Sequence, residues 1–216
     1  MGSDEVHEHW ETRYRESDKL WSGNPNRVLV DVVPSLAPGR AVDLGCGEGA
    51  DAVWLAAHGW HVTAVDASAT AIDRGRRAAD AAGLGAHAGK PGIDWVVADL
   101  ASWEPPAGVD LVTAFFLHSS LAGFDRTAVL RRAAAAVAPG GHLLVVGHAA
   151  PPPWLGEHAH HHGPRDYPAP DEALRELELP GADWEVELAE VRSRTTTGPD
   201  GRPAALDDSV LLLRRR

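Results

Sequence analysis

The stretch Ala41-Val42-Asp43-Leu44-Gly45-Cys46-Gly47-Glu48-Gly49 joins a short apolar run to a glycine-rich turn. This pattern predicts a β-strand, a ligand-binding loop and the start of a helix over residues 50–58. Glycines at such a turn allow positive φ angles and let a ligand approach the backbone. Ala50 stands where a dinucleotide-binding loop would have its third glycine, and the Asp43 carboxylate would repel a pyrophosphate. The loop therefore suits a cationic, amino-acid-like ligand better than a dinucleotide.

The rest of the chain alternates between apolar runs and amphipathic segments, as successive βα units do. We expect strands at 41–44, 60–65, 94–97, 109–114 and 142–147, and helices at 50–58, 69–82 and 125–137. Ser68 is expected to cap the second helix, and Pro139-Gly140-Gly141 to stop the third before its strand. Strands at 184–194 and 206–213 flank the turn Gly198-Pro199-Asp200-Gly201 and predict a hairpin. The expected fold is α/β: a Rossmann-like, doubly wound sheet of about seven strands, mostly parallel, ending in an antiparallel hairpin.

Two segments fall outside this alternation. In residues 1–36, Val6, Trp10 and Tyr14 recur at i+4 spacing, which predicts a helix with one apolar stripe, and Asn26 is expected to cap a second helix. We interpret residues 1–36 as an N-terminal lid; simple packing of its first helix on the domain edge is the alternative. Residues 149–170, rich in proline and histidine, are interpreted as an inserted active-site cover, after which Asp171 is expected to cap a helix over 172–179.

Composition narrows the class of protein. The 216 residues, 44% of them apolar, suit one domain spanning 1–216. A formal net charge of −11 disfavours nucleic-acid and membrane surfaces, which are themselves negative. The single cysteine, Cys46, rules out an intramolecular disulfide framework, and no apolar run reaches the roughly 20 residues of a membrane helix. We expect a cytoplasmic protein that binds neither nucleic acid nor membranes.

Candidate chemical groups follow the predicted strands, where ligands of open α/β sheets bind. Asp66 ends the second strand about 20 residues after the loop, where a carboxylate can hold a ribose diol. His118 and His148 come just beyond the fourth and fifth strands. Either imidazole can accept a proton near neutral pH, and the alternative is that one or both only bond to backbone at the strand ends.

The loop D-L-G-C-G-E-G at 43–49, Asp66, and Ala98-Asp99-Leu100 resemble the S-adenosyl-L-methionine (SAM) signatures of class I methyltransferases. Segments 9–14, 21–26 and 197–201 resemble a small-molecule branch related to thiopurine and tellurite methyltransferases. The resemblance implies SAM as cofactor and an aromatic N-terminal segment that folds over it. It implies a cofactor site formed by Tyr14, Trp21, Asp43, Gly45, Cys46, Gly47, Asp66, Ala67, Asp99, Leu100 and Phe115.

Within that set the resemblance implies separate roles for the polar and apolar groups. Asp43 would order the turn or hold the methionyl amine, and Asp66 would accept from both ribose hydroxyls. Asp99 would bind the adenine amino group, with Leu100 against the ring. Methyl transfer is a direct displacement, so the protein mainly has to align the acceptor and exclude water, with His118 or His148 as optional base.

A histidine cluster raises the question of a metal. His158, His160, His161 and His162 lie beside Glu157, and imidazoles so closely spaced can bind zinc, copper or nickel. Neighbouring side chains on an extended chain point to opposite faces, and no cysteine completes a tetrahedral site. We therefore favour a solvated loop and expect no metal.

The leading hypothesis is a methyltransferase that acts on a small molecule, with the acceptor atom left open among sulfur, nitrogen, oxygen and a heavier chalcogen. A nicotinamide-dependent oxidoreductase is one alternative, because a glycine turn and a distal aspartate also describe that fold. A non-catalytic module that senses SAM or a metal through the histidine-rich loop is the other. The oligomeric state stays undetermined.

Overall fold

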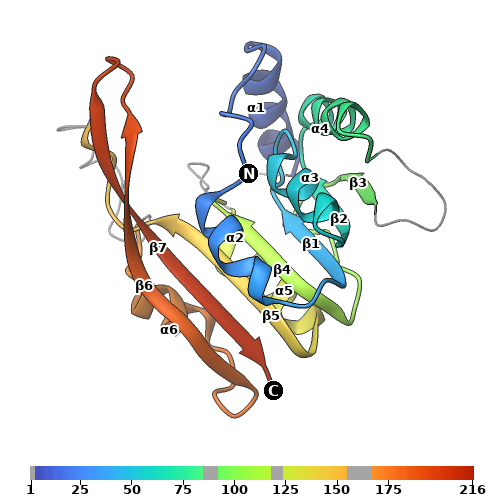
Figure 1. Ribbon diagram of the computed structural model, residues 1–216, viewed down its shortest axis with the longest axis vertical. Helices are drawn as coiled ribbons and strands as arrows, with labels where there is room; N and C mark the ends of the chain where they lie inside the picture. Colours follow the sequence, from blue (N-terminus) through green and yellow to red (C-terminus); the bar gives the residue numbers. More distant parts are fainter. Residues whose placement is uncertain (1–2, 85–91, 118–123, 155–166) are drawn as a thin grey trace.

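The computed structural model describes residues 3–84, 92–117, 124–154 and 167–216, and these fold around one seven-stranded sheet of order β3-β2-β1-β4-β5-β7-β6 (Figure 1). The strands are β1 (Arg40–Leu44), β2 (His61–Asp66), β3 (Ile93–Val97), β4 (Val109–Phe115), β5 (Val137–His148), β6 (Trp184–Thr197) and β7 (Pro203–Arg215). Strands β1 to β5 pair in parallel, whereas β7 is antiparallel to both β5 and β6. The predicted fold class, a mostly parallel sheet that ends in an antiparallel hairpin, is confirmed.

Helices cover both faces of this sheet, and three of the described helices begin at a side chain that caps them. They are α1 (Ser3–Arg15), α2 (Arg27–Val32), the 3-10 turn η1 (Val33–Ser35), α3 (Ala50–Ala57), α4 (Ala69–Ala81), α5 (Arg126–Ala136) and α6 (Pro170–Leu177). Asn26 and Ser68 accept hydrogen bonds from the backbone N–H groups of Val28 and Ala71, as predicted.

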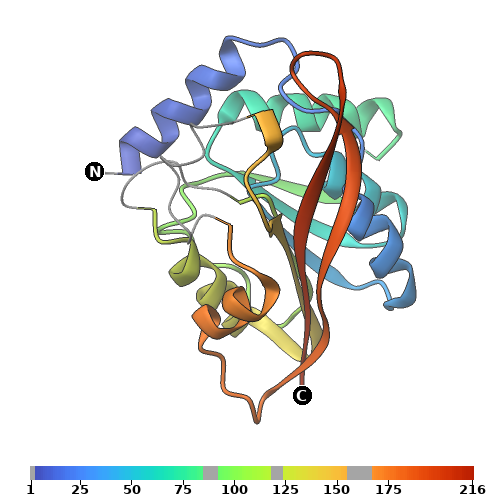
Figure 2. The same cartoon turned by 90° about the vertical axis from the view of Figure 1, so that its left-hand side faces the viewer.

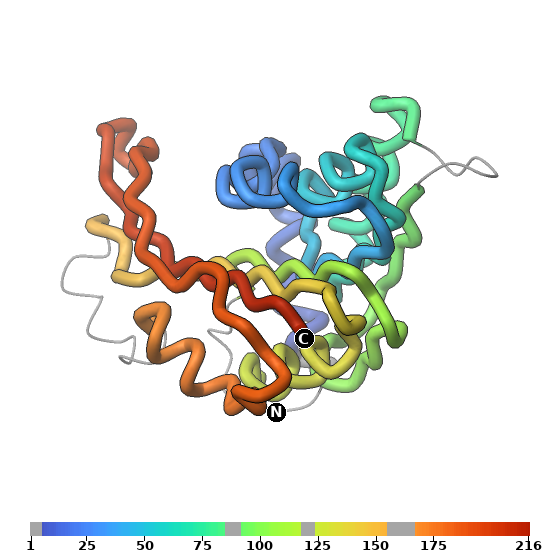
Figure 3. Tube along the Cα trace, turned by 60° about the horizontal axis from the view of Figure 1, so that its bottom comes forward, coloured from blue at the N-terminus to red at the C-terminus, as the bar shows by residue number. Residues whose placement is uncertain are grey.

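Alternation along the strands divides the core into two layers. One layer packs β-strand side chains such as Leu143 and Leu211 against α5 and α6, and the other packs Leu144 and Leu212 against α2 and α3. Figure 3 shows α2 and α3 on one side of the sheet and α5 and α6 on the other. Even-numbered residues of β7 therefore face the side of the sheet that α2 covers. This alternation decides which side chains of β7 can reach the cavity described below.

Two boundary predictions are wrong. Pro139-Gly140-Gly141 does not precede the fifth strand but lies inside β5, because Val137 is 1% exposed, already extended and paired with Val109. Residues 138–141 form an irregularity before pairing resumes at Leu111 and His142. Asp171 does not cap α6 either: the N-cap is Ala169 and Pro170 occupies the first turn, where its missing N–H costs nothing.

The terminal hairpin is longer than predicted. Pairing between β6 and β7 runs from Trp184–Arg215 to Thr197–Pro203, so both strands continue past the end of β5. Figures 1 and 2 show the hairpin rising beyond the rest of the sheet. In the described part of the chain, every helix is too short or too polar to span a membrane.

Candidate functional site

A cavity of about 770 Å³ opens at the carboxyl ends of the parallel strands, between the N-terminal lid and the hairpin. Its floor is the glycine loop that links β1 to α3, and its walls include α1, the start of α2 and β6. This volume lies within the ~300–1,000 Å³ of small-molecule sites in proteins. The cavity is therefore the candidate active site.

Most of the predicted site residues line this cavity. They are Tyr14, Trp21, Gly45, Cys46, Gly47, Asp66, Ala67, Asp99, Leu100, Phe115 and His148. Asp43 is not among the lining residues. His118, Glu157 and the four histidines of the cluster lie outside the described residues, so their predicted roles stay predictions.

The glycine loop is held open by its own backbone and closed over by the lid. Gly47 has a φ of 54°, and a Cβ added there would lie 2.9 Å from the Tyr14 hydroxyl oxygen and 3.3 Å from Trp21 Nε1. The Gly47 N–H donates to Asp66 Oδ2 at 2.9 Å, and the Ser68 N–H donates to Oδ1 at 2.9 Å. Asp66 thus links the loop to the start of α4, while burial raises its pKa.

Asp43 lies behind the loop instead of facing the cavity. Its Oδ1 accepts from the Thr113 hydroxyl at 2.8 Å, and Oδ2 is buried with no hydrogen-bond partner among the described residues. Burial, followed by the neighbouring Asp51 carboxylate, raises the pKa of Asp43 to about 8. An adjacent cation would compensate this buried carboxylate, which agrees with the preference of the loop for a cationic ligand.

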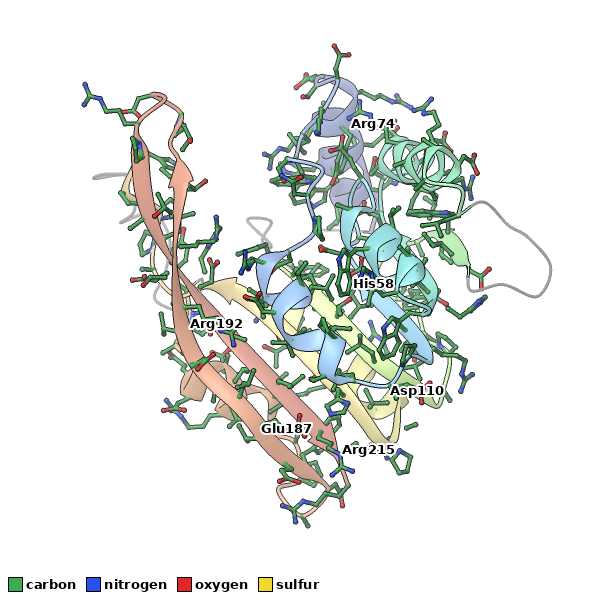
Figure 4. The ribbon with its side chains drawn as sticks, viewed as in Figure 1. His58, Arg74, Asp110, Glu187, Arg192 and Arg215 are labelled. Carbon is green, nitrogen blue, oxygen red and sulfur yellow. The ribbon has the colours of Figure 1, made fainter. Side chains whose placement is uncertain are left out.

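Glu48, which the sequence reasoning passed over, fastens the lid to the loop. Its carboxylate accepts the backbone N–H groups of Leu20 at 3.3 Å and Trp21 at 3.1 Å, and it pairs with Arg74 at 2.8 Å. Arg74 also donates to the carbonyls of Tyr14 and Ser17. Figure 4 shows Arg74 between α1 and α4. One partly buried ion pair thus holds both the glycine loop and the N-terminal segment.

A second contact docks the lid helix. Glu11, 7% exposed, accepts from the Ser68 hydroxyl at 2.7 Å, the Thr70 hydroxyl at 2.7 Å and the Thr70 N–H at 3.2 Å. Burial alone would raise the pKa of Glu11, but these hydrogen bonds and Arg15 outweigh it and lower the pKa to about 2. Both docking contacts place α1 against α4, so the packing of the lid is specific.

Replacing Glu11 by glutamine is expected to destabilise the fold at neutral pH by about 1.5–3 kcal/mol, the usual worth of hydrogen bonds to a charged group. A depressed folded-state pKa contributes stability above the unfolded value and loses it as the pH falls. The difference from the native protein should therefore shrink between pH about 4.5 and about 2. Thermal unfolding across this range measures it, with the exposed Glu8→Gln as control. A difference independent of pH would contradict the assigned ionisation.

At the opposite end of the cavity, two polar side chains and one aromatic ring surround one buried carboxylate. Asp208, 3% exposed, accepts from Arg194 Nε at 2.5 Å and lies 3.2 Å from His148 Nδ1. The Phe116 ring lies 4.7 Å from the His148 ring, and the Arg194 guanidinium carbon lies 5.5 Å from the Phe116 ring centroid. All four residues line the cavity, which gives the predicted base His148 an acidic partner.

The sequence reasoning missed Asp208, Arg194 and Phe116. One signal was available: Asp207 and Asp208 interrupt an apolar strand, and a charged residue on the buried face of a strand needs a partner. The identity of that partner depends on the pairing register of β5, β7 and β6, which the sequence pattern does not specify. Trp154, which belongs to the predicted cover 149–170, does not line the cavity and lies beside Gly198 at the hairpin turn.

The chemistry of the site fits SAM in two respects. The backbone at Gly47 leaves no room for a side chain, and the carboxylates of Asp66 and Asp99 follow β2 and β3 and line the cavity. The antiparallel β7 between β5 and β6 differs from the all-parallel order of dinucleotide-binding folds. Fold and site together agree with the class of SAM-dependent methyltransferases.

Comparison with known families agrees and makes the assignment specific. Residues 41–141 match the family model described as a methyltransferase domain. Residues 41–141 therefore carry a methyltransferase domain, and a structural neighbour solved with S-adenosyl-L-homocysteine indicates SAM as the cofactor of such a domain.

Individual relatives share only about a third or less of their residues with this chain over the matched region. The chain is 27% identical over 140 residues to a probable thiol methyltransferase 2 of Arabidopsis thaliana, which covers 63% of this chain and 60% of that protein. It is 30% identical over 170 residues to a trans-aconitate 2-methyltransferase of Azoarcus sp.; this match covers 77% of this chain and 54% of that protein. The N-methyltransferase NodS of Bradyrhizobium japonicum, solved with S-adenosyl-L-homocysteine, superposes with a TM-score of 0.66 at 17% identity and covers 97% of this chain and 98% of that one. The chain thus matches less than two-thirds of the length of either curated relative.

Proposed function

We propose that this protein transfers the methyl group of SAM to a nucleophilic atom of a small molecule. The observation that carries the proposal is one continuous cavity that joins the glycine loop and Asp66 to His148 and Asp208. A cofactor bound over the loop and an acceptor beside His148 would then share one enclosed space. SAM, once bound, supplies an electrophilic methyl group on a sulfonium.

A small acceptor is supported by the way the cavity is bounded. The lid closes the loop end through Tyr14 and Trp21, and β6 closes the other end through Arg192 and Arg194. Figure 4 shows Arg192 on the hairpin strand β6. The names of the two curated relatives refer to a thiol and to trans-aconitate, which are small molecules. The net charge of −11 opposes a nucleic-acid acceptor, because such surfaces meet negative charge with Lys and Arg.

We assign each lining residue a role from its position along the cavity. We assign Asp66 to the ribose, Asp99 and Leu100 to the adenine, and the Gly45–Gly47 backbone to the methionyl part. The lid excludes water from the reacting atoms and aligns the acceptor. His148 accepts the proton that the acceptor loses as it attacks, because an imidazole exchanges protons near neutral pH.

Calorimetric titration with SAM and separately with NAD tests the cofactor assignment. We expect SAM to bind with a dissociation constant in the micromolar range, about −8 kcal/mol, and NAD to give no binding heat. NAD binding without SAM binding would favour the oxidoreductase alternative. Release of S-adenosylhomocysteine with a panel of thiols, amines and phenols then tests turnover. SAM binding without product from any acceptor in the panel would favour the SAM-sensing alternative.

A further inference from the structure

His148, Asp208 and Arg194 come from three adjacent strands, and the pairing register brings them together. Asp208 of β7 lies opposite His148 of β5 on one side and opposite Arg192 of β6 on the other, two residues from Arg194. Alternate residues of a strand share a face. These side chains therefore lie on the cavity face of the sheet and do not depend on a loop for their placement.

Asp208 is arranged to share one negative charge between two partners. Its Oδ2 accepts from Arg194 Nε and its Oδ1 faces His148 Nδ1, while the side chain is only 5% exposed. A carboxylate this buried is costly unless it is paired and hydrogen-bonded. The Asp208 charge consequently acts on His148 with little screening by solvent, and Arg194 offsets part of it.

We propose that Asp208 and Arg194 are positioning residues that set the tautomer and the basicity of His148. This inference rests on the proposed function, in which His148 takes the proton of the acceptor. An Nδ1–H group that donates to Asp208 places the imidazole lone pair on Nε2. The Asp208 carboxylate favours the imidazolium form of His148, and the Arg194 guanidinium opposes it.

The arrangement also specifies a class of acceptor. A base held in this way serves a protic nucleophile, meaning a thiol, a phenol or an amine, and is not needed by an acceptor that arrives without a proton. The proton goes to Nε2 as the acceptor lone pair forms the bond to the methyl carbon. The electron pair of the broken carbon–sulfur bond stays on sulfur, so charge and atoms balance.

Two cationic side chains also lie at this end of the cavity. Arg192 of β6 lies opposite Asp208 of β7, and Arg126 of α5 approaches the end of β5, where a Cβ added to Gly147 would lie 3.8 Å from Arg126 Nη2. Arg192 is itself 3.9 Å from the Asp31 carboxylate. The uncharged Phe116 ring packs on His148 from β4. The Asp208 carboxylate, 3.2 Å from His148 Nδ1, is positioned to favour the imidazolium form.

Nuclear magnetic resonance titration of the unliganded full-length protein tests the proposal without any acceptor. The signals of His148 are assigned by their absence in His148→Gln. We expect Asp208→Asn to lower the pKa of His148 by about one unit and Arg194→Gln to raise it by about half a unit. The ring nitrogen shifts should report a proton on Nδ1 in the native protein and a mixture of tautomers in Asp208→Asn.

Asp207→Asn is the matched control, because Asp207 is the neighbouring carboxylate and bonds to the Ser193 hydroxyl instead. It should leave the pKa of His148 unchanged. Shifts of the same sign in Asp208→Asn and Arg194→Gln, or no shift in either, would overturn the proposal; if Asp208→Asn fails to fold, the sign of the shift in Arg194→Gln decides. Opposite shifts in a protein that methylates nothing in the panel would reject the proposed function and leave the coupling itself standing.

Discussion

Gly47→Val is expected to weaken SAM binding by at least a hundredfold, about 2.7 kcal/mol. The residue has a φ of 54°, where a β-branched side chain is strained, and its added Cβ would lie 2.9 Å from the Tyr14 hydroxyl oxygen. The valine would occupy the space in which the lid meets the loop. Both the glycine loop and the lid residues that contact it would be displaced.

Calorimetry with SAM measures the loss, and limited proteolysis of the N-terminal segment measures release of the lid. Gly83→Val is the matched control: Gly83 has a φ of 73° but nothing within 4 Å of an added Cβ. It carries the same backbone strain without the contact, so it should lower stability and leave SAM affinity intact. Normal SAM binding by Gly47→Val would show that the loop has been misassigned.

Asp66→Ala is expected to reduce both cofactor affinity and the order of the loop. The substitution leaves the N–H groups of Gly47 and Ser68 without the acceptor they share, and each such bond to a charged group is worth about 1.5–3 kcal/mol before compensation by solvent. The same carboxylate is assigned to the ribose hydroxyls of SAM. The loss of affinity should therefore amount to a few kcal/mol at most, together with a lower midpoint of thermal unfolding.

Titration with SAM and thermal unfolding separate the two effects of Asp66→Ala. Asp66→Asn retains one oxygen acceptor and should fall between the native protein and the alanine variant. Asp80→Ala, an exposed aspartate on α4, is the control and should change neither quantity. Unchanged affinity in a folded Asp66→Ala variant would remove this residue from the cofactor site.

Local patterns in the sequence were sufficient for the cofactor end of the site. The turn at 45–49, the aspartate that ends β2 and the caps Asn26 and Ser68 depend on neighbours within a few residues, and βα units bring strand ends to one edge of the sheet. The positions of Asp66 and Asp99 along this cavity follow from that rule. The early end of α5 did not follow from it, because burial of Val137 against Val109 outweighed the turn signal of Pro139-Gly140-Gly141.

Glu48 shows where local reasoning stops. Glu48 lies inside the glycine loop, yet it attaches the lid to that loop through Arg74 and through the backbone of Leu20 and Trp21. These residues lie 26 to 28 positions away in the sequence. Nothing in the spacing of these residues indicates that they meet. The first helix could be predicted from its aromatic stripe, whereas its attachment to the loop could not.

The sequence by itself determined the fold class, the glycine loop and the edge of the sheet where the candidate site lies, because each depends on short-range periodicity and on the handedness of βα crossovers. Tertiary structure decided which groups act together at the acceptor end. His148, Arg194 and Asp208 are separated by 14 to 60 residues and meet only through the register of three strands. A shift of that register by one residue would turn Asp208 to the opposite face, away from His148 and the cavity.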